Sequence, residues 1–263
     1  MMAGYGDDLI ATGLARGARA RGKRIAFGDG SRLAWYARSP MIFRNNPNIA
    51  TPGSEFCGDV EWIDYRKGRR IYNQDGGDRW IWNYDFEPKP GELYFDSHEL
   101  AWAERFERGF VVVEPNVEWN KVSARNKDWG RWKYQRVANH LIARKVRVVQ
   151  FDVGPAKLDG VEIIKTPDFR YSMAVVKRAS LVITSEGGLH HGAAAVGAKA
   201  VVIFGGWIPP EATGYSIHVN LTALGPACGI YKPCDHCRRA MDLITVDEVI
   251  SHAERLIQEE VCA

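Results

Sequence analysis

The feature of this sequence that most restricts its fold is the alternation of short apolar runs with helical patterns in its second half. Runs rich in β-branched residues occur at 110–114, 147–151, 161–164, 181–184 and 200–204, and helical patterns occur at about 131–144, 171–178 and 189–196. Parallel strands that are buried on both faces produce such near-continuous apolar runs. The βαβα order therefore predicts a doubly wound α/β sheet, closed by an amphipathic helix at about 246–257.

The first half also begins as an α/β unit. A glycine-rich start at residues 4–8 precedes a helical pattern through about residue 21, and a strand is predicted at 24–27. Further strands are expected at 59–65 and 92–95, whereas 67–90 is rich in Gly, Pro, Trp and charge and is predicted to be a long irregular excursion. Because only residues 1–3 precede the first glycines, the first strand is either very short or the start is unusual. We place a domain boundary between residues 108 and 109, which separates units 1–108 and 109–263.

Composition and charge limit the classes of protein that this chain can represent. No apolar run approaches the roughly 18 to 20 residues of a membrane span, and no secretory leader is evident, so a cytoplasmic protein is expected. A net charge of +3 suits phosphate-bearing ligands but is less basic than is typical of a dedicated nucleic-acid binder.

The sharpest local signal is the segment Ser-Glu-Gly-Gly-Leu-His-His at 185–191, between a predicted buried strand and an Ala-rich helix. Backbone N–H groups at such a helix N-terminus bind anions, so a diphosphate fits there, with Glu186 accepting hydrogen bonds from sugar hydroxyls. The alternative is that Gly187 and Gly188 only form the turn and Glu186 caps the helix. His190 and His191 point about 100° apart, so only one of them is expected to face a cleft.

Three further charged residues have both a structural and a functional interpretation. Asp7 and Asp8 are either acids that stabilise a helix N-terminus or, for one of them, a general base. Lys127 follows a predicted strand by a loop long enough to reach a phosphate, although most lysines are simply solvated.

The cysteines and the aromatic excursion are also ambiguous. Cys228, Cys234 and Cys237 cluster in sequence, but their spacing does not match a paired zinc motif, so reduced thiols without a metal are expected. Trp80 and Trp82 belong to an aromatic segment that either stacks on sugars or bases or forms the core of a small domain.

Taken together, these segments resemble the family 9 glycosyltransferases, the heptosyltransferase family. Four blocks carry the resemblance, in the family's order along most of the chain: residues 6–12, residues 127–129, residues 186–205, and the C-terminal cysteines with the closing helix. Glu186 stands where the family has aspartate and Gly187 where it has threonine, which leaves the donor sugar open. The chain is also shorter than typical members, chiefly in its first domain, which leaves the acceptor open.

The resemblance implies a GT-B-like fold, in which two Rossmann-like doubly wound domains face a central cleft, with a reduced N-terminal acceptor-side domain. It implies an inverting transfer from a nucleotide-diphosphate sugar to a saccharide or glycolipid hydroxyl, with Asp7 as the catalytic base and Asp8 as its substitute. The implied contacts with the donor and its phosphates are Lys127, Glu186, Gly187, Gly188, Leu189 and His191. Tyr5, Trp80 and Trp82 are candidate acceptor contacts. Neither a metal nor a cofactor beyond the co-substrate is implied.

Three alternatives remain from the sequence. The same chemistry on a hydroxymethylated DNA base would show salt-sensitive DNA binding. A non-catalytic module would bind nucleotide sugars or carbohydrates without transfer. A nicotinamide-dependent oxidoreductase is disfavoured, because the Gly-x-Gly pairs at 4–6 and 28–30 lack the third glycine of that fingerprint. The sequence does not identify the donor sugar, the nucleotide base, the acceptor or the oligomeric state.

Overall fold

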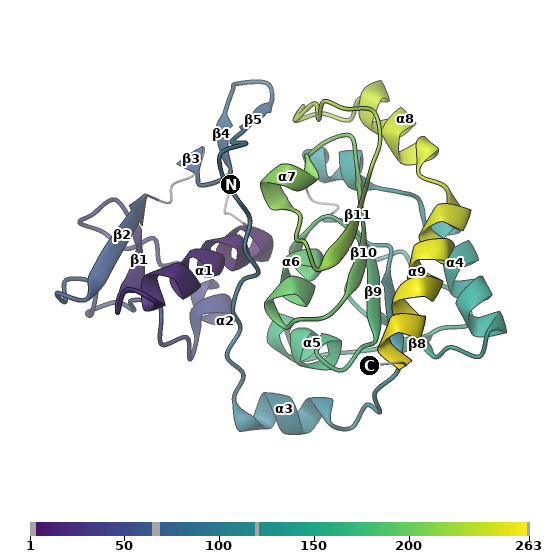
Figure 1. Ribbon diagram of the computed structural model, residues 1–263, viewed down its shortest axis with the longest axis horizontal. Helices are drawn as coiled ribbons and strands as arrows, with labels where there is room; N and C mark the ends of the chain where they lie inside the picture. Colours follow the sequence, from purple (N-terminus) through teal and green to yellow (C-terminus); the bar gives the residue numbers. More distant parts are fainter. Residues whose placement is uncertain (1–3, 65–68, 119–120, 262–263) are drawn as a thin grey trace.

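The computed structural model describes residues 4–64, 69–118 and 121–261, which form an N-terminal part and a C-terminal part that face each other (Figure 1). The helices are α1 (Tyr5–Arg19), α2 (Ser39–Phe43), α3 (Ser97–Ala103), the 3-10 helix η1 (Val122–Lys127), α4 (Arg131–Ala143), α5 (Phe169–Val176), α6 (Gly188–Ala195), α7 (Pro210–Thr213), α8 (Asp235–Leu243) and α9 (Val246–Val261). The strands are β1 (Arg24–Gly28), β2 (Val60–Asp64), β3 (Arg69–Arg70), β4 (Asn73–Asp75), β5 (Trp80–Trp82), β6 (Val111–Glu114), β7 (Val148–Phe151), β8 (Glu162–Ile164), β9 (Leu181–Ser185), β10 (Ala200–Gly205) and β11 (His218–Thr222).

The C-terminal part is built on a six-stranded sheet in the order β8-β7-β6-β9-β10-β11. Every strand pair in this sheet is parallel. The chain enters at β6, moves outward to β8 and then crosses back to β9, so the order reverses between β6 and β9. This confirms the predicted doubly wound α/β class, and ligands of such sheets bind outside the carboxyl ends of the strands at this reversal.

Alternate residues of the central strands face two different hydrophobic cores. Val111 and Val113 of β6 pack with the helices α4 and α9 on one face, whereas Phe110 and Val112 pack with α5 and α6 on the other. Figure 1 shows α4 and α9 on one side of the sheet and α5 and α6 on the opposite side. Burial on both faces explains why these strands read as continuous apolar runs.

The N-terminal part contains less sheet than a full Rossmann-like domain. Among the residues that the structure describes, β1 and β2 form a two-stranded parallel sheet, and β3, β4 and β5 form a separate antiparallel sheet within the predicted irregular excursion. A short first strand would fall on residues 1–3, which lie outside the described residues. Tyr65, the last residue of the strand predicted at 59–65, also lies outside them. The boundary between 108 and 109 remains a prediction.

The strand predicted at 92–95 is wrong. This extended segment lies across α1 and bonds to its side chains: the Glu92 N–H donates to Thr12 Oγ1 at 2.8 Å, and Arg16 donates to the Gly91 carbonyl at 3.1 Å. A Cβ at Gly91 would lie 2.4 Å from the Leu9 carbonyl oxygen, so the segment and α1 are in direct backbone contact. Its apolar residues are therefore partly buried by packing on helices rather than by strand pairing.

A buried ion pair joins the two parts. Arg170 of α5 donates to both carboxylate oxygens of Glu99 in α3, at 2.5 and 2.9 Å, and both side chains are 1% exposed. Arg170 also donates to the backbone carbonyls of Met41 and Tyr94 in the N-terminal part. The fork of the guanidinium thus fixes three segments at one point.

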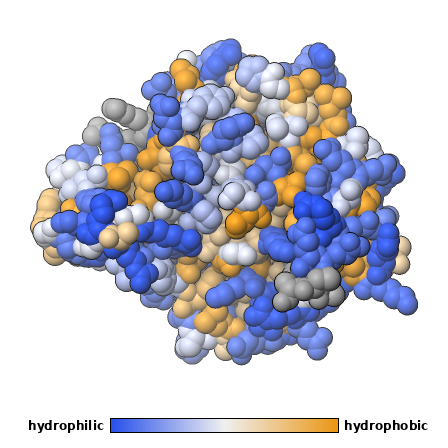
Figure 2. Space-filling view, in the orientation of Figure 1, coloured by the Kyte–Doolittle hydropathy of each residue, from blue (hydrophilic) through white to orange (hydrophobic). Residues whose placement is uncertain are grey.

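The surface seen in Figure 2 is mainly hydrophilic, with hydrophobic side chains in separate areas. Within the described part of the chain, no helix has both the length and the apolar character needed to cross a membrane.

The Glu99→Gln variant tests the ion pair. Removing one charge leaves Arg170 buried without its counter-ion, so we expect a loss of about 3 kcal/mol in the free energy of unfolding, measured by urea titration. Glu259→Gln is the matched control, since Glu259 pairs with Arg255 on the surface of α9 at 2.8 Å with 49% of its side chain exposed. Equal stability of the two variants would contradict this role of the buried pair.

Candidate functional site

The glycine turn lies at the carboxyl end of β9, beside the reversal of strand order. Strand β9 ends at Ser185, and α6 begins at Gly188 without a side-chain cap at Gly187. The first hydrogen bond within the helix runs from the His191 N–H to the Gly187 carbonyl at 3.1 Å. The structure therefore has the predicted strand, turn and helix, with an uncapped N-terminus suited to an anion.

Glu186 is held between a lysine and a histidine at this turn. Its carboxylate lies 2.8 Å from Lys127 Nζ and 3.1 Å from His191 Nε2, with 5% of its side chain exposed. Burial raises the pKa of Glu186, but the positive Lys127 and the hydrogen bond from His191 outweigh it, and the net pKa is lowered to about 2. Glu186 is thus ionised at neutral pH and bonds to these two side chains instead of capping α6.

Lys127 is positioned by the residue before it. Asn126 Nδ2 donates to the carbonyls of Ile230 and Lys232 at 3.0 and 2.9 Å, which anchors η1 to the loop before α8. Lys127 Nζ also lies 5.2 Å from the centre of the Trp207 ring. The predicted phosphate-binding lysine therefore stands at the glycine turn, with its charge balanced by Glu186.

The adjacent histidines have different surroundings. His191 bonds through Nδ1 to the Tyr215 hydroxyl at 2.9 Å and through Nε2 to Glu186. His190 packs against Phe204 and His218, neither of its ring nitrogens has a hydrogen-bond partner among the described residues, and burial lowers its pKa. His191 thus belongs to the turn, whereas His190 is a core residue.

The N-terminus of α1 lies directly against the N-terminus of α6. A Cβ at Gly6 would lie 2.7 Å from His191 Cδ2 and 3.6 Å from the Gly188 nitrogen, so a larger residue does not fit there. Beside this contact, the ring of Tyr5 stacks on Phe169 with centres 4.7 Å apart. Residues near 6 and near 190 are thereby brought to one place.

Asp7 stands at this junction and is held by the small sheet. The Tyr72 hydroxyl donates to Asp7 Oδ1, the Gly4 N–H donates to Oδ2 at 2.7 Å, and Arg70 Nη2 lies 3.3 Å from Oδ2. Burial raises the pKa of Tyr72, which keeps it a donor. Sequence reasoning missed Tyr72 and Arg70, because it treated their segment as an irregular excursion.

Asp8 points into the N-terminal part instead. It is 2% exposed and lies 3.4 Å from Arg38 Nε. Burial outweighs the attraction of Arg38 and raises the pKa of Asp8 to about 6. The two adjacent acids therefore occupy different environments.

Trp80 and Trp82 attach the small sheet to the C-terminal part. Trp80 meets Tyr231 edge-on at 5.1 Å and donates its backbone N–H to the Gly229 carbonyl, while Trp82 meets Trp207 edge-on at 5.7 Å. These contacts fit the core interpretation of the aromatic segment, and Trp82 also borders a cavity.

Three thiols gather beside that docked loop. Cys228 Sγ lies 3.7 Å from Cys234 Sγ and 3.2 Å from Cys237 Sγ, too far apart for disulfides. Thiolates around a tetrahedral zinc are about 3.8 Å apart, given Zn–S bonds of about 2.3 Å. The hydrogen bond with Cys237 lowers the pKa of Cys228, which favours a thiolate. The geometry thus also suits a metal ion, and the expectation of reduced thiols without a metal stays a prediction.

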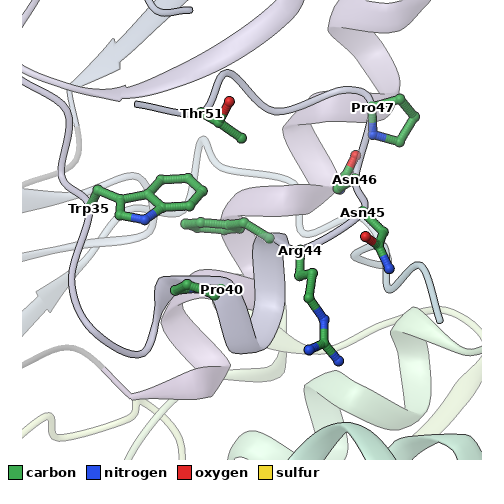
Figure 3. A pocket seen from close by; sticks show the side chains of 8 residues that line it. Trp35, Pro40, Arg44, Asn45, Asn46, Pro47 and Thr51 are labelled. Atoms are coloured by element: carbon green, nitrogen blue, oxygen red, sulfur yellow. The ribbon is translucent and has the colours of Figure 1, made fainter. Parts of the chain in front are cut away.

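Among the described residues, two of the cavities lie outside the glycine turn. The larger, about 470 Å³, lies within the N-terminal part (Figure 3) and is lined by Trp35, Pro40, Phe43, Arg44, Asn45, Asn46, Pro47 and Thr51. The second, about 330 Å³, is lined by Arg70, Asn73, Gln74, Ile81, Trp82 and Asn83. Arg70 therefore both lines the second cavity and contacts Asp7.

Comparisons with known proteins identify the fold but no sequence family. No family model and no curated protein matches the chain. Among solved structures, the iron-containing dodecameric glycosyltransferase TibC from enterotoxigenic E. coli matches with a TM-score of 0.66 and 15% identity, over 98% of this chain and 75% of that one.

Two shorter matches cover about two thirds of this chain. A family 9 glycosyltransferase from Veillonella parvula matches with a TM-score of 0.50 and 16% identity over 66% of this chain. The E. coli ADP-heptose lipopolysaccharide heptosyltransferase II matches with a TM-score of 0.48 and 17% identity over 68% of this chain. In both cases this chain spans 55% of the other protein's length. At these identities the likeness concerns architecture: the chain has a GT-B-like α/β fold similar to that of heptosyltransferase-type glycosyltransferases.

Proposed function

We propose that this protein is an inverting glycosyltransferase that takes its sugar from a nucleoside-diphosphate sugar. The observation that carries the proposal is the hydrogen-bonded group Lys127, Glu186 and His191 at the uncapped N-terminus of α6, beside the turn of α1 that carries Asp7. A phosphate-binding helix end and a carboxylate base on opposite sides of one junction are what displacement at an anomeric carbon requires. The fold shared with TibC, a glycosyltransferase, supports the same function.

On the donor side, the diphosphate binds at the N–H groups of Gly188 and Leu189. Lys127 transfers its hydrogen bonds from Glu186 to the phosphate oxygens, and the negative charge of the leaving diphosphate is stabilised by the lysine and by the helix end. Glu186 remains ionised and accepts hydrogen bonds from donor hydroxyls, with His191 keeping one of its oxygens in place.

On the acceptor side, Asp7 takes the proton of the attacking hydroxyl. The acceptor oxygen forms a bond to the anomeric carbon while the bond to the diphosphate oxygen breaks, which inverts the configuration. Tyr72 and Arg70 orient the Asp7 carboxylate from the small sheet. Asp8 is less suited to this role because it is buried against Arg38 in the N-terminal part.

Lys127→Ala tests the donor site. Loss of a charge-assisted hydrogen bond to phosphate is worth about 1.5–3 kcal/mol, so the affinity for the preferred nucleoside diphosphate should fall about 10- to 100-fold. Calorimetric titration with ADP, UDP and GDP measures it, and Lys177→Ala, an exposed lysine after α5, is the control. An unchanged affinity would remove Lys127 from the site, and wild-type protein that binds no nucleotide would refute the donor class.

Asp7→Asn tests the base. We expect kcat for sugar transfer or donor hydrolysis to fall about 100- to 10,000-fold while donor affinity stays near that of the wild type. Asp85→Asn, the same exchange in an exposed loop, controls for the substitution. Full activity of Asp7→Asn would refute the assignment. Donor binding without turnover by the wild type would favour a non-catalytic module, and salt-sensitive transfer to hydroxymethylated DNA would favour the nucleic-acid acceptor.

We also propose that Cys228, Cys234 and Cys237 hold one thiophilic metal ion. The spacing of their sulfur atoms supports this, and TibC is described as iron-containing. The ion would cross-link the loop that carries Gly229 and Tyr231 to the start of α8 and so support the docking of the small sheet. Glu186, His190 and His191 form a second close group, but the Lys127 ammonium on Glu186 opposes cation binding there.

Elemental analysis of the purified protein tests the metal proposal. About one equivalent of zinc or iron per chain is expected for the wild type and for Cys57→Ser, whose exposed thiol stands apart from the cluster. Cys237→Ser should lose the ion, because two thiolates hold a metal poorly. Wild-type protein that stays metal-free after reconstitution with either ion would show that the thiols are simply reduced.

A further inference from the structure

Four side chains from separate segments form one hydrogen-bonded chain at the turn after β9. The Tyr215 hydroxyl lies 2.9 Å from His191 Nδ1, and His191 Nε2 lies 3.1 Å from Glu186 Oε1. The other carboxylate oxygen, Glu186 Oε2, lies 2.8 Å from Lys127 Nζ. Tyr215 follows the short helix α7 and is the member of this chain to which the proposed reaction gives no role.

The direction of each hydrogen bond in this chain follows from Glu186. Its pKa is lowered to about 2, so the carboxylate is ionised at neutral pH and can only accept hydrogen bonds. His191 must therefore carry a hydrogen on Nε2. In the neutral imidazole the other nitrogen, Nδ1, is then an acceptor, and the Tyr215 hydroxyl is its donor. Burial raises the pKa of Tyr215, so the hydroxyl keeps the proton that it donates.

The Tyr215 hydroxyl also fixes the orientation of the imidazole ring. Among the described residues it is the hydrogen-bond partner of His191 Nδ1, and Tyr215 is buried, so water competes little for this bond. The ring also packs on α1, because a Cβ at Gly6 would lie 2.7 Å from His191 Cδ2. A ring turned over about its Cβ–Cγ bond would present carbon atoms to Tyr215 and Glu186 and would leave the hydroxyl donor unpaired, which is costly.

The anchor matters most when a donor is bound. In the proposed function Lys127 moves its hydrogen bonds to the phosphate, and His191 is then the described side chain that still bonds to Glu186. A ring held at both nitrogens keeps the carboxylate in one orientation, whereas a ring held at one nitrogen is freer to turn. Binding groups hold their geometry when a second layer of hydrogen bonds fixes their rotamers.

We propose that Tyr215 is a positioning residue of the donor site: its hydroxyl holds His191 as a donor through Nε2 and thereby keeps Glu186 aimed at the transferred sugar. The effect on the sugar rests on the proposed function, whereas the state of the His191 ring does not. Because Tyr215 acts through His191 and Glu186, nucleoside diphosphates, which lack the transferred sugar, should bind independently of it.

Nitrogen-15 NMR of the full chain, labelled at histidine, tests the state of the ring. The spectra distinguish a protonated from a bare ring nitrogen, and the loss of signals in His191→Gln identifies the His191 resonances. A protonated Nε2 and a bare Nδ1 are expected at neutral pH. Tyr215→Phe removes only the hydroxyl and should shift the Nδ1 resonance, whereas Tyr84→Phe, the same exchange at an exposed position, should leave it unchanged.

Calorimetry on the same proteins tests the positioning role. ADP-glucose, UDP-glucose and GDP-mannose are the probes that carry a sugar, and ADP, UDP and GDP are the probes that lack it. Tyr215→Phe should weaken the binding of the nucleotide sugar that the wild type prefers by about 3- to 10-fold. The affinity for the nucleoside diphosphates should stay unchanged, because Lys127 and the N-terminus of α6 are intact. A general structural defect would weaken both kinds of probe.

The outcomes separate this proposal from the proposed function. A bare Nε2 in the wild type, or an Nδ1 resonance that does not respond to Tyr215→Phe, would overturn the ring anchor. Equal affinities of wild type and Tyr215→Phe for nucleotide sugars, or an equal loss for both kinds of probe, would refute the positioning role while the donor site stands. If the ring behaves as expected but no nucleotide binds to the wild type, the anchor stands, and its role in donor binding fails together with the glycosyltransferase proposal.

Discussion

The contact between the N-termini of α1 and α6 is the constraint on which the candidate site depends. Gly6 has no side chain, and a Cβ there would meet the His191 ring, so the two helix ends approach until their backbones are close neighbours. This approach brings the turn that carries Asp7 beside the turn that carries Glu186. It also directs the positive ends of both helix dipoles toward one region, which favours a strongly anionic ligand between them.

The small antiparallel sheet adds a second level of organisation. It reaches from the N-terminal part to the loop at 229–231, where Trp80 and Tyr231 pack together, and it returns Tyr72 and Arg70 to Asp7. The same loop lies next to Cys228 in sequence. A metal ion at the thiols would therefore stabilise, through this sheet, the surroundings of Asp7 from a distance.

The sequence predicted five of the six strands of the C-terminal sheet, because parallel strands that are buried on both faces leave a strong apolar signal and because a Gly-Gly turn marks the strand-to-helix junction. It missed the edge strand β11. The structure of the N-terminal part was harder to predict from the sequence. The segment at 92–95 has the composition of a strand, yet its backbone bonds to Thr12 and Arg16 of α1. Conversely, β3 to β5 are two or three residues long, too short for periodicity to detect.

Local sequence determined which residue types stand at helix ends and strand ends, and so placed Asp7, Lys127 and Glu186 among the candidates. Tertiary structure alone decided their partners. Whether Asp7 or Asp8 faces α6, whether Lys127 reaches the glycine turn, and whether Tyr215 reaches His191 all depend on contacts between segments far apart in the chain. Such contacts are set by packing in three dimensions, and a one-dimensional pattern carries no record of which buried faces meet.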